Sequence, residues 1–291
     1  MKYVYIVNRF NFKERTNKIV EKLRLVSEKF NRDYEIVINE TLDDVYKLKE
    51  RFKYSEDIIT AIGGDGSINL VLNNLMGTNN ILSYIPYGTG NDFYRANLED
   101  LKSGIHDIDV IRINDRYFIN VSCFGIDADI ANDDRYVHNK LIPESMRYNA
   151  SVIHHFLTYE GRKMRVEFDD KVIEQDFTTI IVANAKYYGG GYKVSPNSKY
   201  DDGVFDVFLV DRLNKVKMAS IILSMKNAGH LKNPALKSFT TNKLVISADE
   251  TFKANIDGEA IEANRFELEI IPSGFKIDFD PEFISEFLKN K

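Results

Sequence analysis

The first third of the chain alternates between short apolar runs and longer segments whose apolar residues recur every three or four positions. The short runs predict strands, and the periodic segments predict amphipathic helices. The expected strands are Tyr3–Val7, Tyr34–Ile38, Asp57–Ile62 and Ile81–Ile85, and the expected helices are Ile19–Phe30, Leu42–Phe52 and Ser67–Leu75. This alternation indicates crossover units and a mainly parallel sheet, with a ligand crevice beyond the carboxyl ends of the strands.

The rest of the chain has a different pattern, in which short strand candidates are separated by turn-rich segments. These candidates are Tyr117–Phe124, Met164–Phe168, Phe177–Ala183, Val204–Val210, Lys243–Ser247, Phe252–Ile256 and Phe266–Ile271. Helical interruptions are expected near Ser145–Tyr159 and Lys215–Ala228. The pattern predicts an antiparallel sandwich or barrel-like domain. We therefore expect an α/β domain over residues 1–125 and an all-β domain over residues 126–280.

Composition narrows the class of protein. A chain of 291 residues is long enough for two domains. The single cysteine, Cys123, excludes an internal disulfide and fits a reducing cytosol, so we expect a cytoplasmic protein. The net charge of −5 argues against a nucleic-acid partner. Since no stretch approaches the roughly 18 apolar residues of a transmembrane segment, we expect any membrane contact to be transient and peripheral.

A glycine-rich loop, Gly63-Gly64-Asp65-Gly66-Ser67, stands where the third strand ends and the next helix begins. Glycines let the backbone approach a ligand closely, and the free N–H groups of a helix N-terminus favour phosphate. A carboxylate such as Asp65 would be repelled by phosphate unless a cation lay between them, which suggests a direct or water-mediated Mg²⁺ ligand. A plain strand–turn–helix with Ser67 as the capping residue explains the same residues without a ligand.

A second loop of the same kind favours the phosphate-binding explanation over the plain turn. The segment Pro86–Phe93 follows the fourth strand and contains Gly88, Thr89 and Gly90. Loops at the carboxyl ends of neighbouring parallel strands converge on one crevice. Together the two loops could grip a polyphosphate from two sides.

Five ordered motifs give the chain a resemblance to a known family. The segments GGDGSINLVLNNL (63–75) and PYGTGNDFYR (86–95) resemble the catalytic domain of the diacylglycerol kinase family, and more narrowly its small bacterial lipid kinases. Asn184 with Gly189–Gly191 resembles the family's glycine-triplet segment. Lys199–Val204 resembles its Asp-Asp-Gly segment, and Asn255–Glu259 its late Asp-Gly-Glu segment.

The resemblance implies a nucleotide-binding α/β domain like that of NAD kinases and phosphofructokinases, followed by a β-sandwich. It also implies that the C-terminal tail, residues 281–291, returns to the first domain. The implied cofactors are ATP and Mg²⁺, and the implied substrate is a lipid at a membrane surface. The chain departs from the family pattern at Asn8-Arg9-Phe10, where relatives have Asn-Pro and small residues, and Ser67 replaces a commoner threonine.

Site residues follow from the loops and from the resemblance. For nucleotide binding we expect Asn8, Thr41, Gly63, Gly64, Asp65, Gly66, Ser67, Asn69 and Thr89. The resemblance makes Glu259 the proton acceptor in catalysis with Asp257 as its close competitor. It also implies a second, structural Mg²⁺ on the Asp202 carboxylate and main-chain oxygens such as those of Lys199 and Val204. We also count Asp65 among the catalytic residues. Thr41 could equally cap the helix that begins at Leu42, and Asp257-Gly258 is also a common hairpin turn.

The expected reaction is ATP- and Mg²⁺-dependent transfer of the γ-phosphate to a hydroxyl of a diacylglycerol-like lipid, giving a phosphatidic-acid-like product. Phosphatidylglycerol or a sphingoid base is the alternative acceptor, and NAD kinase, which shares the GGDG loop, is a more distant one. A catalytically silent nucleotide-binding regulator would lack Asp65 or Glu259, and both are present. The sequence leaves the assembly open between a monomer and a homodimer.

Overall fold

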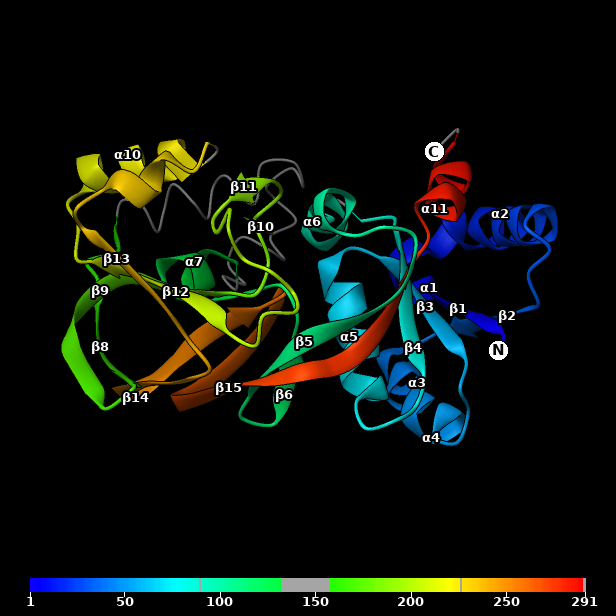
Figure 1. Ribbon diagram of the computed structural model, residues 1–291, viewed down its shortest axis with the longest axis horizontal. Helices are drawn as coiled ribbons and strands as arrows, with labels where there is room; N and C mark the ends of the chain where they lie inside the picture. The colour runs from blue at the N-terminus through cyan, green and yellow to red at the C-terminus, as the bar shows by residue number, and fades with distance from the viewer. Residues whose placement is uncertain (89, 132–157, 226, 290–291) are drawn as a thin grey trace. The chain divides into compact units, whose positions relative to one another are not determined.

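The computed structural model describes residues 1–88, 90–131, 158–225 and 227–289 (Figure 1). The chain divides into two units, one made of Met1–Ile108 with Ser273–Lys291 and the other of Asp109–Pro272. The domain limits predicted from the sequence, at residues 125 and 280, stay a prediction. The helix expected near Ser145–Tyr159 lies outside the described residues except for its last two positions.

The first unit is built around a parallel sheet with the strand order β2-β1-β3-β4 and the end of β15. Its strands are β1 (Tyr3–Asn8), β2 (Tyr34–Asn39), β3 (Ile58–Gly63), β4 (Ile81–Pro86) and the last part of β15 (Glu259–Phe279). Its helices are α1 (Arg9–Phe12), η1 (Lys13–Arg15), α2 (Thr16–Lys29), α3 (Leu42–Tyr46), α4 (Leu48–Phe52), α5 (Asp65–Leu75), α6 (Asp92–Asp100) and α11 (Pro281–Leu288). The predicted crossover pattern is therefore observed.

Helices cover both faces of this sheet (Figure 1). On one face, Tyr5 and Val7 of β1 pack with apolar residues of α2 and α11, including Leu23 and Phe283. The rings of Tyr5 and Phe283 stack with centroids 5.9 Å apart. On the other face α5 packs on β3, and α3 and α4 pack on α5. Because all six residues of β3 and of β4 are buried, these strands appear in the sequence as continuous apolar runs.

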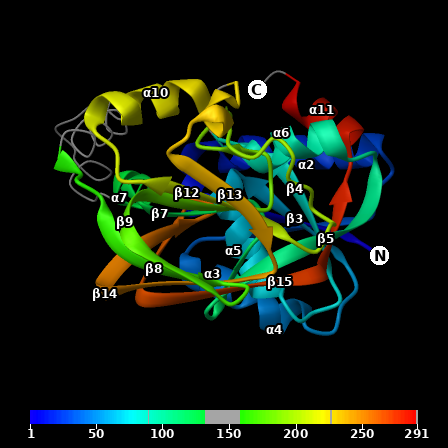
Figure 2. The ribbon, with the colours of Figure 1, turned by 60° about the vertical axis from the view of Figure 1, so that its left-hand side comes forward.

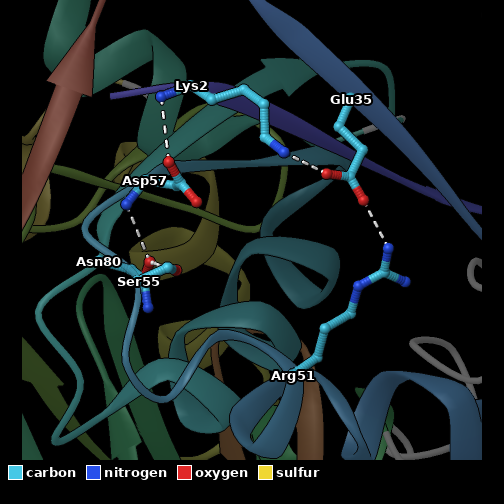
Figure 3. A network of polar contacts seen from close by, with 6 residues as sticks. All are labelled: Lys2, Glu35, Arg51, Ser55, Asp57 and Asn80. Carbon is cyan, nitrogen blue, oxygen red and sulfur yellow. Dashed lines mark hydrogen bonds and ion pairs between the residues drawn. The ribbon is translucent and has the colours of Figure 1, made fainter.

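A polar network holds the amino ends of the strands together (Figure 3). The backbone N–H of Lys2 donates to Asp57 at 3.0 Å, and its ammonium group pairs with Glu35. Asn80 accepts from the N–H of Asp57 at 3.1 Å and from the hydroxyl of Ser55 at 2.6 Å. These contacts satisfy the polar groups at this edge, and the glycine loops lie at the opposite, carboxyl edge.

The second unit is antiparallel and consists mainly of strands. They are β6 (Arg116–Phe118), β7 (Val121–Gly125), β8 (Arg162–Phe168), β9 (Lys171–Ala183), β10 (Tyr187–Tyr188), β11 (Tyr192–Lys193), β12 (Phe205–Asp211), β13 (Leu236–Thr241), β14 (Lys243–Ile256) and the first part of β15, while β5 (Gly104–Ile113) enters from the first unit. The helices are α7 (Ile126–Ala131), α10 (Lys215–Met225) and η2 (Gly229–Lys232).

Four strands of this unit close on themselves. β7 and β8 each pair with both β9 and β14, so the four form a ring around an apolar core (Figure 2). The core includes Phe124, Val166, Ile180, Ile246 and Phe266, all almost fully buried. Burial of side chains of this size stabilises the fold by about 1.5–3 kcal/mol each. The predicted fold class, an α/β unit and an antiparallel sandwich-like unit, is confirmed.

Several predicted elements differ in detail. The segments Lys243–Ser247 and Phe252–Ile256 form one strand, β14, whose register against β15 shifts between them. Such an irregularity keeps a strand continuous through polar residues that suggest a turn. The opposite happens at Tyr117–Phe124, which divides into β6 and β7 at Ile119-Asn120. β5, β13 and α6 were not predicted. Among the described residues, no helix is long and apolar enough to cross a membrane.

Candidate functional site

The two glycine loops are in direct contact. Gly63 and Pro86, the last residues of β3 and β4, are register partners, and the N–H of Tyr87 donates to the carbonyl of Gly63 at 2.9 Å. A Cβ placed on Gly88 would lie 2.5 Å from the Cα of Gly64. Only glycine at position 88 allows this approach without movement of the backbone. The predicted convergence of the loops is thus a feature of the structure.

The first loop leads into the N-terminus of α5. The N-cap residue is Gly64, and the helix begins at Asp65, so Ser67 is not the cap. The N–H groups of Ser67 and Ile68 already donate to the carbonyl of Gly64. The Ser67 hydroxyl lies against Gly63, where a Cβ would come within 2.2 Å of it. The first N–H groups of the helix and the positive end of its dipole suit a phosphate.

Asp65 joins the two loops. Its carboxylate accepts hydrogen bonds from the N–H groups of Asp92 at 3.0 Å and Phe93 at 3.1 Å, the first residues of α6. Burial raises the pKa of Asp65, and these two N–H groups oppose that rise. The N-terminus of α6 and the positive charge of Arg95 offset part of the effect of burial on this carboxylate. Its role as a Mg²⁺ ligand stays a prediction.

The other nucleotide candidates have structural contacts of their own. Asn8 is buried and its side chain accepts from Asn39, its register partner in β2, at 3.0 Å. Asn69 is fully buried in α5 and accepts from Asn73. Thr41 precedes α3 and donates from both its N–H and its hydroxyl to Asp44, so the capping explanation is observed. Thr89 lies outside the described residues.

In the second unit, Asp257 is held by three consecutive backbone donors. Its carboxylate accepts from the N–H groups of Ile119 at 2.9 Å, Asn120 at 3.1 Å and Val121 at 2.9 Å. This contact explains why Tyr117–Phe124 is divided: the backbone turns at Ile119-Asn120 to present its N–H groups. The three N–H groups engage both carboxylate oxygens of Asp257.

Glu259, two residues further on, is in a different environment. It is the first residue of β15, and no described residue hydrogen-bonds to its carboxylate. The side chain is exposed, but surrounding protein displaces part of its water, which raises the pKa of Glu259. The guanidinium of Arg116 opposes this rise. A carboxylate that is accessible and has a raised pKa is suited to general-base chemistry.

The predicted metal loop is rich in acidic groups. Loss of hydration raises the pKa of Asp202, and the nearby charges of Asp206, Asp109 and Asp201 raise it further. A divalent cation would relieve the repulsion among these carboxylates, and the set of Asp202 and main-chain oxygens stays a prediction. The part of the chain that is described contains no group of three or more His, Cys, Asp or Glu residues arranged for a metal.

Three residues that the sequence reasoning did not assign to a site contribute to these sites. Asp92, only 2% exposed, pairs with Arg95 at the start of α6. Asp109 accepts from the N–H of Gly203 at 2.7 Å, next to the metal loop. Asn184, noted before only as part of a motif, donates to the carbonyls of Asp109 and Ile119, both at 3.1 Å. Of the three, Asp109 lies within a strand, β5, where a buried acidic residue signals that a specific partner satisfies it.

An apolar cavity lies under α10 in the second unit. Its lining includes Ile181, Val210, Met218 and Ile221. His230, also in the lining, is 2% exposed, and its Nε2 lies 2.9 Å from the carbonyl of Val194. A carbonyl partner requires the proton on Nε2, so Nδ1 carries a lone pair, and it has no partner among the described residues. Burial lowers the pKa of His230, which favours this neutral form.

Comparison with known proteins agrees with both units. Residues 2–113 match the diacylglycerol kinase catalytic domain, and residues 120–278 match the YegS C-terminal NAD kinase beta sandwich-like domain. The chain is 26% identical over 237 residues to a diacylglycerol kinase of Bacillus subtilis (strain 168), and the aligned region covers 75% of this chain and 76% of that protein. It is also 26% identical over 267 residues to a diacylglycerol kinase of Staphylococcus epidermidis, covering 87% and 84%.

A crystal structure of a protein assigned as a diacylglycerol kinase from Bacillus anthracis superposes with a TM-score of 0.74 at 23% identity, covering 96% of this chain and 95% of that one. At this identity the superposition demonstrates the shared fold. The two domain matches cover most of the chain. The chain therefore belongs to the diacylglycerol kinase catalytic-domain family, and it is a lipid kinase in the general sense, an ATP-dependent phosphotransferase with an alcohol acceptor.

Proposed function

We propose that the chain transfers the γ-phosphate of ATP, with Mg²⁺, to a hydroxyl of a diacylglycerol-like lipid, giving a phosphatidic-acid-like product. The observation that carries the phosphoryl-transfer part is the contact between Gly64 and Gly88 at the N-terminus of α5. The diacylglycerol-like acceptor is supported by the relatives, which are named diacylglycerol kinase. A lipid acceptor would bring the protein to a membrane surface as a peripheral protein.

In this proposal the residues have separate roles. The backbone of Gly63–Ser67 holds the ATP phosphates, and the lipid hydroxyl oxygen attacks the γ-phosphorus. The bond to the β–γ bridging oxygen breaks, ADP leaves, and Glu259 accepts the hydroxyl proton. Asp202, with main-chain oxygens of Lys199 and Val204, would hold a structural Mg²⁺. A separate Mg²⁺, ligated directly or through water by Asp65, would when bound neutralise phosphate charge.

A transfer assay tests the acceptor directly. The full-length protein is incubated with Mg²⁺, ATP labelled at the γ-phosphate, and diacylglycerol, phosphatidylglycerol, sphingosine, ceramide or NAD in mixed micelles. The expected result is a labelled product from diacylglycerol with a kcat/KM at least about tenfold above the other acceptors, a difference of about 1.4 kcal/mol in transition-state binding. Preferred labelling of another lipid would assign that lipid as the substrate in place of diacylglycerol. Labelling of NAD alone would overturn the lipid proposal.

A further inference from the structure

The turn that carries Glu259 has a conformation that does not by itself need a carboxylate. Asp257 and Gly258 connect β14 to β15 and both have positive φ, +49° and +96°. Two-residue hairpin turns of this kind form as readily with Asn-Gly or Gly-Gly as with Asp-Gly. Hairpin formation alone therefore leaves the charge at position 257 unexplained.

The three donors at Ile119, Asn120 and Val121 explain the charge. Asp257 is 5% exposed, so its carboxylate must be satisfied within the protein. It receives three N–H bonds of 2.9–3.1 Å, and its own N–H donates to the carbonyl of Val121 at 3.1 Å. An asparagine has only one acceptor oxygen, and its NH₂ group would face backbone donors. The carboxylate thus joins the turn to the break between β6 and β7.

Glu259 depends on this attachment for its orientation. No described residue hydrogen-bonds to its carboxylate, and one glycine separates it from Asp257. Gly258 is itself restrained, because its N–H donates to the side chain of Asn255 at 3.1 Å. The backbone at 257–258, together with the pairing of Glu259 with Ile256 between β14 and β15, therefore places Glu259.

We propose that Asp257 is a positioning residue for Glu259: by occupying the three N–H groups of residues 119–121, it fixes the turn from which the base reaches the lipid hydroxyl. This inference rests on the proposed function, in which Glu259 is the proton acceptor. It removes Asp257 from the competition for that role and gives it a different one.

A double-mutant cycle on the full-length protein tests the inference. Asp257→Asn keeps a favourable turn but removes one acceptor oxygen, and it should lower kcat about 100-fold, the order expected for a displaced catalytic group. The KM for ATP should stay within about twofold, because ATP binding does not use Glu259. If Asp257 acts through Glu259, the double variant with Glu259→Gln should be no slower than Glu259→Gln alone. If the fold-losses in kcat of the two single variants multiply in the double variant, Asp257 has an independent, structural role, and the inference is overturned.

Two further variants separate positioning from general destabilisation. Asp257→Gly gives a Gly-Gly turn that tolerates positive φ, so it should fold and lose the same activity. Ile246→Val, in β14, removes one buried methylene and should lower the melting temperature while kcat stays unchanged. Both are measured by thermal unfolding and by kcat at saturating lipid.

The outcomes distinguish this inference from the proposed function. Full turnover in Glu259→Gln would remove Glu259 as the base, and the role of Asp257 with it. Loss of turnover in Glu259→Gln, with Asp257→Asn and Asp257→Gly both within twofold of the wild type, would leave the base in place and overturn the positioning inference alone.

Discussion

Asp65 in the first unit and Asp257 in the second are both aspartates beside a glycine, and both were expected to take part in catalysis. In both cases the carboxylate accepts backbone N–H groups, from the start of α6 in one unit and from the break between β6 and β7 in the other. The difference lies in what each holds. Asp65 joins two loops whose function rests on the main chain, whereas Asp257 holds a turn whose function rests on the neighbouring side chain, Glu259.

This contrast suggests two ways of building a site. The glycine loops present backbone N–H groups, which do not titrate. The geometry of these loops depends on close contact between their backbones. The sites of the second unit depend on Glu259 and Asp202, both exposed carboxylates whose pKa is raised. Variants of the first unit should therefore act on stability and ATP binding. Variants of the second should act on turnover, metal dependence and pH profile.

The largest effect is expected at Glu259. Glu259→Gln should lower kcat by about 10²–10⁴-fold, the usual contribution of a general base, and leave the Kd of ATP unchanged in calorimetric titration. Glu262→Gln is the matched control, because it changes an exposed glutamate of the same strand whose ion pair among the described residues is with Lys253. Unchanged turnover in Glu259→Gln would remove this residue from the mechanism.

The metal loop is tested by Asp202→Asn. Half-maximal activity should then require at least about tenfold more Mg²⁺, which is the cost of losing even an outer-shell partner of a metal. Mg²⁺ should raise the melting temperature of the wild type, since a ligand bound only to the folded state stabilises it, and this shift should disappear in the variant. Asp201→Asn, one residue away, serves as control. An equal Mg²⁺ requirement in all three proteins would contradict the site.

Gly88→Ala tests the contact between the glycine loops. The added methyl group would meet backbone at 2.5 Å, so the fold should lose about 1–3 kcal/mol, the usual cost of overpacking. Gly64→Ala is the matched control, because its methyl group would lie 3.5 Å from Gly88 and its φ is −95°. We expect Gly64→Ala to melt near the wild-type temperature while weakening ATP binding. Equal melting temperatures for both variants would show that the loops separate easily.

The pH profile tests the environment of Glu259. The base acts when ionised, so kcat/KM should fall as pH drops through its raised pKa, above the value of about 4.3 for an ordinary glutamate. Arg116 stabilises the ionised form, and Arg116→Met should therefore move this acid limb to higher pH. A shift to lower pH would contradict the assignment.

Folding favours the protonated form of Glu259, so the stability that this group contributes is present at low pH and is lost as pH rises through the raised pKa.

The smallest effect is expected for Asp65→Asn. Asparagine can still accept one N–H of α6, so the loss should be about 1 kcal/mol, as for other N-cap substitutions. The melting temperature should fall by a few degrees, and the Mg²⁺ concentration for half-maximal activity is measured in the same variant. A tenfold rise in that concentration would instead support the role of Asp65 as a metal ligand.

The sequence was sufficient to predict the class of each unit and the meeting of the glycine loops. Apolar runs that end in glycine define β3 and β4, and parallel strands bring their carboxyl ends together whatever the details of packing. Periodicity could not predict the division of Tyr117–Phe124, because that break is caused by Asp257, more than 130 residues away in the chain.

The roles of individual carboxylates were decided by the tertiary structure alone. Asp257 and Glu259 are two residues apart in one motif. Nothing local distinguishes an aspartate that accepts from three N–H donors from a glutamate to which no described residue donates. Asp65 likewise meets its partners at Asp92 and Phe93 only because the second loop folds against the first. The sequence by itself determined which elements form and where acidic groups collect. The chemistry of each group depends on hydration and hydrogen-bond partners, which distant segments supply.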